Sequence, residues 1–133
     1  MTHVGGTFDV KLTPAALADT AADKALGRLT IEKQYHGDLE ATGKGEMLTA
    51  GTSVKDSAGY VAMEQVTGTL SGRRGAFVLQ HSGTMTRGTP QLTITIVPDS
   101  GTGQLAGLAG KMTIRIEAGK HYYELEYTIA GTP

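Results

Sequence analysis

The stretch "KMTIRIEAGKHYYELEYTI" (residues 111–129) has the pattern of a β-hairpin and decides the fold class. Apolar residues occupy every second position on both arms, and Gly119-Lys120 matches the Gly-X pattern of a two-residue turn. This turn would place Ile114 opposite Leu125 on an apolar face. The other face carries mainly charged and polar residues, so we expect a sheet with one face on a core and one in solvent.

A second hairpin is predicted around "VTGTLSGRRGAFVLQHSGT" (residues 66–84). A four-residue loop, 71–74, would place Glu64 opposite His81, because a slip by one residue would mix polar and apolar side chains on both faces. The expected inward face carries Tyr60, Ala62, Glu64, Val66, Leu70, Phe77, Leu79 and His81. Two ionisable groups therefore lie side by side on an otherwise apolar surface.

Four more segments alternate in the same way and complete a set of eight strands. Three of them are 7–12, 26–36 and 91–97. The fourth, 38–49, follows a predicted Gly37-Asp38 turn that would align Leu29 with Glu46 and point Glu46 inward. Strands of about ten residues with mostly short connections favour an up-and-down meander, and eight strands can close into a barrel without exposed edges. We therefore predict an all-β, eight-stranded antiparallel closed barrel.

Length and composition favour one small domain over residues 1–133. Twelve basic and 13 acidic residues give a net charge of −1, with no basic stripe, so nucleic acid is not an expected partner. Cysteine is absent, which excludes disulfides and thiolate chemistry. Since no apolar run approaches the roughly 20 residues of a membrane span, we expect a soluble, cytoplasmic protein that does not enter a membrane.

Two connections are longer than a hairpin turn. The glycine-rich segment 98–110 is expected to cross one mouth of the barrel. In the segment 13–24, Thr13 suits a helix cap and Pro14 suits the first helical position. This segment is predicted to be either a short helix or a mobile loop that covers a rim as a lid.

The strongest candidate site is Glu64 with His81, joined by Glu46. A carboxylate beside an imidazole in an apolar cavity can act as a general acid/base pair. The alternative is a structural ion pair that closes one end of the barrel. The remaining expected ligand-binding residues, besides Glu46, are Tyr35, Tyr60, Phe77, Leu79, Ile94, Ile114, Tyr123 and Tyr127.

Other site classes have weaker support. The four histidines lack metal-ligand spacing, so no metal or cofactor is expected, although His81 with Glu46 and Glu64 is kept as a weaker metal hypothesis. The run 101–110 fails the dinucleotide-binding pattern because Ala106 occupies the last glycine position. No G-x-S-x-G motif supports a serine hydrolase.

Three runs, "VTGTLSGRRGAFVLQHSGT", "IVPDSGTGQLAGLAG" and "YYELEYTI", resemble a bacterial family known as domain of unknown function 3224 (DUF3224). The resemblance extends from "GTFDVKL" to the last strand and implies an allene oxide cyclase-like eight-stranded barrel. It also marks Glu46, Glu64, Gln80 and His81 as recurring polar positions, although alternation sends Gln80 outward. The family carries no established activity, while the wider superfamily includes cyclases that enclose a hydrophobic substrate.

These observations lead to three hypotheses of different classes. The first is a barrel that binds a small hydrophobic molecule and isomerises or cyclises it by proton transfer, with Glu64 as base and His81 tuning or relaying the proton. The second is a binding module without catalysis. The third is a structural barrel that is filled by its own side chains and acts through an oligomer surface, so a homo-oligomer is left open.

Overall fold

The computed structural model describes residues 1–18 and 25–130. The strands are β1 (Thr2–Ala15), β2 (Leu26–Gly37), β3 (Leu39–Gly51), β4 (Ala58–Leu70), β5 (Arg73–Thr86), β6 (Thr89–Ile96), β7 (Thr102–Gly103), β8 (Leu108–Glu117) and β9 (Lys120–Ile129). Within these ranges, no helix is long and apolar enough to cross a membrane.

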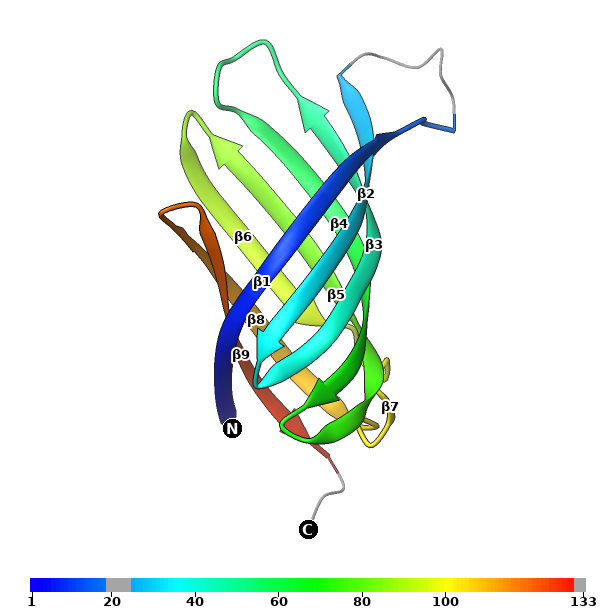
Figure 1. Cartoon of the computed structure of the whole chain (residues 1–133). Helices are drawn as coiled ribbons and strands as arrows, with labels where there is room; N and C mark the ends of the chain where they lie inside the picture. Colours follow the sequence, from blue (N-terminus) through cyan, green and yellow to red (C-terminus); the bar gives the residue numbers. More distant parts are fainter. Residues whose placement is uncertain (19–24, 131–133) are drawn as a thin grey trace.

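The eight long strands form one closed antiparallel barrel (Figure 1). Each strand pairs with the next along the chain, and β1 closes the ring by pairing with β9. The two-residue β7 lies in the connection between β6 and β8 and pairs with β5. The predicted fold class is therefore confirmed, with β7 as an addition to the eight expected strands.

Successive side chains of each strand point alternately outward and toward the barrel axis, and the inward-pointing side chains form a single core. The side chains of this core are less than a tenth exposed. They are Phe8, Tyr35, Leu39, Ala41, Val66, Leu70, Phe77, Leu79, Ile94, Ile96, Leu105, Leu108, Met112, Tyr123, Leu125 and Tyr127. Two polar residues, Glu64 and His81, lie buried beside this core.

Both predicted hairpins form, but each register differs from the expected one by two residues. Glu64 pairs with Leu79, and Ile114 pairs with Tyr123. The turn residues explain the shift, since Ser71 (φ 48°) and Ala118 (φ 51°) adopt positive φ beside a glycine that does the same. Such pairs form tight two-residue turns that match the twist of the strands. A shift of two residues keeps every side chain on its face, so the inward series is unchanged.

The predicted register of β2 against β3 is wrong by one residue. Leu29 pairs with Met47 in place of Glu46, which turns Glu46 to the outer surface. The cause is Leu39, which is buried in the core and donates its N–H to the hydroxyl of Tyr123 at 2.9 Å. This contact draws Leu39 inward and sets the phase of the strand that follows.

The glycine-rich 98–110 connection lies beside the β4–β5 hairpin at one end of the barrel and buries Leu105 in the core (Figure 1).

The helix start that the sequence predicted at Thr13 and Pro14 is wrong, because both residues belong to β1 and pair with β2. Since β9 pairs with β1 only up to Phe8, Pro14 needs no N–H on that side. Residues 19–24 of this segment lie outside the described residues.

Candidate functional site

A buried polar network is centred on Glu64 of β4, which is fully enclosed. One carboxylate oxygen, Oε1, accepts a hydrogen bond from Lys33 Nζ at 3.0 Å and lies 2.9 Å from His81 Nε2. The other oxygen, Oε2, accepts a hydrogen bond from the hydroxyl of Tyr35 at 2.5 Å. Both oxygens are therefore occupied by donors from β2 and β5.

The register of the sheet brings these four groups together. Glu64 pairs with Leu79 and His81 pairs with Ala62, so Glu64 and His81 are diagonal neighbours on the inner face. The predicted proximity of Glu64 and His81 thus survives the shift in register. Lys33 and Tyr35 are successive inward positions on β2. They reach Glu64 across β3, where Gly43 has no side chain in the way.

Electrostatics hold the Glu64 carboxyl in its charged form. Burial by itself raises its pKa, but the hydrogen bond from His81, the charge of Lys33 and the hydrogen bond from Tyr35 together outweigh burial and lower the pKa below its ordinary value. Burial and the neighbouring Glu64 raise the pKa of Tyr35, which therefore stays a donor. An ionised carboxylate only accepts hydrogen bonds, so the facing ring nitrogen of His81 carries a proton.

Lys33 was not among the residues predicted from the sequence, yet its side chain is only 7% exposed. Its ammonium lies 4.9 Å from the ring centroid of Phe8 and 5.7 Å from that of Tyr35. Such cation–π contacts favour a desolvated charge. The signal was present in the sequence, because alternation from Ile31 to Tyr35 places residue 33 on the inner face.

The other expected ligand-binding residues divide into three groups. Those buried in the core are Tyr35, Phe77, Leu79, Ile94, Tyr123 and Tyr127, with Ile114 packed against them. Tyr60 lies at one end of the barrel beside Gly83, where an added Cβ would meet its ring. Glu46 was predicted to point inward, which is wrong, because it forms an ion pair with Arg28 on the outer face.

The outward turn of Glu46 also separates the three residues of the weaker metal hypothesis. Glu64 and His81 face the interior, while Glu46 is solvent-exposed. Among residues 1–18 and 25–130, no group of three or more His, Cys, Asp or Glu side chains is placed to hold a metal ion.

A hollow of about 610 Å³ opens at the end of the barrel opposite β7. Its inward-facing lining is mainly apolar and consists of Met47, Thr49, Ala58, Tyr60, Gly83, Met85, Pro90, Leu92 and Ile116. The pairing of β6 with β8 explains the opening, because it is limited to Ile94–Met112 and Thr95–Lys111. Beyond these pairs the pairing stops, and the hollow is lined by residues from the ends of both strands and of β3, β4 and β5.

Comparison with known proteins places this barrel in a family. A family model described as "Protein of unknown function (DUF3224)" matches residues 4–127. The chain belongs to the DUF3224 family. The crystal structure of a DUF3224-family protein of unknown function from Shewanella oneidensis MR-1 is similar, with 51% sequence identity, a TM-score of 0.93 and 99% of each chain covered. No curated protein matches the chain.

In this DUF3224 barrel the polar network lies one layer below the hollow. His81 is two residues from Gly83 on the same inner face, and Gly83 lines the hollow. Glu64 lies deeper still, next to core residues such as Val66. The interior therefore has three levels: a filled apolar core, a charged layer, and an apolar space that reaches solvent.

Proposed function

We propose that this DUF3224 protein binds a small, largely apolar molecule in the hollow above the Glu64 network. The strongest support is the contrast between the two ends of the barrel interior, one of which is filled and the other open. The core side chains below the network are packed together, whereas the space lined by Met47, Tyr60 and Leu92 is empty of side chains. The rim is also apolar and accessible, since Ile116 is 62% exposed.

The size and chemistry of the hollow limit the ligand class. A volume of about 610 Å³ lies within the usual range for small-molecule sites, roughly 300–1,000 Å³. Its inward-facing polar side chains are Thr49 and Tyr60, whose hydroxyls can orient one or two polar atoms. An uncharged molecule with a mainly hydrocarbon surface fits these features better than a charged one.

In this proposal the Glu64 network is a structural layer that closes the hollow on its inner side. Glu64 has no exposed surface, both of its oxygens accept hydrogen bonds, and its pKa is lowered, which makes it a weak base. These features favour the structural alternative for Glu64 over the expected role of catalytic base. Proton-transfer isomerisation or cyclisation through Glu64 and His81 stays a prediction, tested by turnover in a Glu64→Gln variant once a substrate is identified.

Titration with Nile red, an uncharged apolar fluorophore, tests the binding proposal. We expect saturable one-to-one binding to the wild-type protein, and at least a tenfold weaker affinity for Leu92→Lys, because that substitution places a charge in the hollow. The matched control is Val54→Lys. Val54 is 44% exposed, comparable to 39% for Leu92, and it does not line the hollow.

Two results would overturn the proposal. One is the absence of saturable binding to the folded wild-type protein. The other is equal binding by Leu92→Lys and Val54→Lys, which would place the dye elsewhere on the surface. Native mass spectrometry of the protein purified from its source would then identify the natural ligand of a confirmed site.

A further inference from the structure

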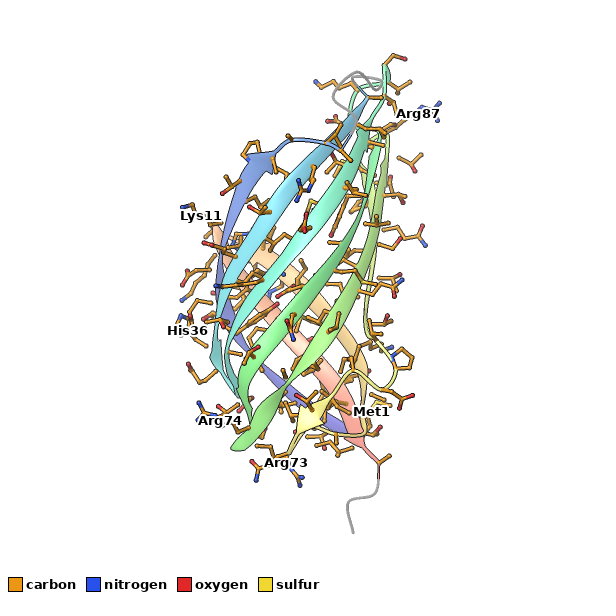
Figure 2. All side chains as sticks on the ribbon, turned by 90° about the vertical axis from the view of Figure 1, so that its right-hand side faces the viewer. Met1, Lys11, His36, Arg73, Arg74 and Arg87 are labelled. Atoms are coloured by element: carbon orange, nitrogen blue, oxygen red, sulfur yellow. The ribbon has the colours of Figure 1, made fainter. Side chains whose placement is uncertain are left out.

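Four large apolar side chains lie on the outer surface of β2, β3 and β4, away from the hollow. They are Leu26, Leu48, Val61 and Met63, and each is between 51% and 52% exposed. Leu48 pairs directly with Val61, and Met63 follows two residues later on the same strand and face. Figure 2 looks onto this outer surface, and the cationic side chains that it labels lie at the ends and one edge of the view.

The patch is continuous with two shallow grooves. One, of about 600 Å³, is lined by Leu48, Val61 and Met63, and the other, of about 510 Å³, by Leu17, Leu26 and Leu48. Isolated exposed apolar residues are ordinary on protein surfaces, whereas contiguous ones with adjoining grooves mark interaction sites. We call Leu17, Leu26, Leu48, Val61 and Met63 the outer patch.

An ion pair identifies the kind of partner. Arg28 pairs across the strands with Leu48, and Glu46 pairs with Met63, so both charges lie inside the outer patch. The Arg28 guanidinium donates to the Glu46 carboxylate from two nitrogens, Nε at 2.6 Å and Nη2. A patch that carries one positive and one negative group side by side can bind a second copy of the same patch. If the two copies are related by a two-fold axis that passes between the charges, Arg28 of each copy faces the partner's Glu46.

We propose that the outer patch is the interface of a homodimer, occupied by the same patch of a second copy of this chain. Its apolar residues supply the buried area, and the paired charges fix the orientation of the two copies. The balanced charge of the patch argues against a membrane surface as the occupant, because anionic lipids attract clusters of Lys and Arg. The proposal uses the outer face and is independent of ligand binding in the hollow.

Sedimentation equilibrium of the full chain at micromolar concentration tests the apolar part of the interface. We expect the wild-type protein to be a dimer and Met63→Lys to be a monomer, because the added ammonium gives the outer patch two positive groups for the single carboxylate of Glu46. Val54→Lys is again the matched control, since Val54 lies outside the patch and has similar exposure. It should dimerise like the wild type.

Charge reversal tests the orientation of the two copies. Arg28→Glu leaves two acidic groups in the patch, and Glu46→Arg leaves two basic groups. Each variant alone should be monomeric because like charges face each other across the axis. An equimolar mixture of the two should form a one-to-one heterodimer, because each acidic patch then faces a basic one. Circular dichroism melting confirms that both variants are folded.

Each result of these experiments either supports or overturns the proposed dimer interface. Recovery of a dimer on mixing supports the interface, since variants that had merely lost their fold would not recover. A wild-type protein that is monomeric throughout would overturn it. A wild-type dimer that Met63→Lys leaves intact would also overturn it, because the contact would then use another surface. Neither result would affect the binding of Nile red in the hollow.

Discussion

Gly43 lies directly against the carboxylate of Glu64. A Cβ added at residue 43 would overlap Glu64 Oε2 and come within 3.2 Å of the Tyr35 ring. The absence of a side chain on β3 is therefore what allows donors from β2 to reach an acceptor on β4. The network depends on one glycine as much as on its four polar members.

Gly43→Ala should accordingly destabilise the protein by about 1–3 kcal/mol, the usual cost of overpacking a well-filled interior. Urea denaturation measures the change in the free energy of unfolding. The matched control is Gly59→Ala in β4, where the added Cβ meets only ordinary contacts at 3.6 Å or more. Equal stabilities of the two variants would show that the carboxylate moves aside freely.

Glu64→Gln should be more damaging, because it leaves the ammonium of Lys33 buried without a counter-ion. Removing one partner of a buried pair costs about 3–5 kcal/mol. The double variant Glu64→Gln with Lys33→Met removes the stranded charge as well and should regain much of that loss. A double variant no more stable than Glu64→Gln would refute the ion-pair explanation. Urea denaturation of all four combinations gives the coupling energy.

The lowered pKa of Glu64 predicts a loss of stability in acid. A group whose folded pKa lies below its unfolded value binds a proton less readily when folded, so it stabilises the fold above the unfolded pKa. The contribution should be complete above pH 5 or so, and it should fall as the pH drops from the ordinary carboxyl value of 4.5 through the lower folded value. Glu64→Gln should flatten this part of the profile, whereas Glu124→Gln, at an exposed position, should retain the wild-type shape.

Tyr123, one of the expected ligand-binding residues, organises the turn between β2 and β3 through its hydroxyl. Its hydroxyl accepts from the N–H of Leu39 at 2.9 Å and donates to the carbonyl of His36 at 3.0 Å. Tyr123→Phe should cost about 1–3 kcal/mol, because the buried N–H loses its acceptor. Thermal unfolding measures it against Tyr122→Phe, whose ring lies on the outer face near Arg115. Similar melting temperatures for the two variants would contradict this role.

The barrel was predictable from the sequence because alternation is a local property. Each strand shows its apolar face in five or six residues, and a two-residue shift in a hairpin leaves that face unchanged. For the same reason, the contact between Glu64 and His81 could be expected even though they are not directly paired. Lys33 could also have been found, since it lies between Ile31 and Tyr35 on one face.

The rest depended on contacts between distant parts of the chain. The phase of β3, and with it the side to which Glu46 points, is set by a hydrogen bond between Leu39 and Tyr123, which are 84 positions apart. The hollow depends on where β6 and β8 stop pairing, beyond Ile94 and Met112. The apolar periodicity of a single strand therefore predicts neither the phase of β3 nor the position of the hollow.

The turn at Ala118-Gly119 gives a last test, one that concerns the register of the hairpin. Ala118 has a φ of 51° and Gly119 a φ of 78°, the combination for which Asn-Gly is the preferred pair. Positive φ is costly for alanine and easier for asparagine. Ala118→Asn should therefore raise the free energy of unfolding by about 0.5–1 kcal/mol, and Ala118→Val should lower it by about 1–2 kcal/mol. Because residue 118 is solvent-exposed, neither change alters the core, so a reversed order in urea denaturation would mean that the hairpin closes through another turn.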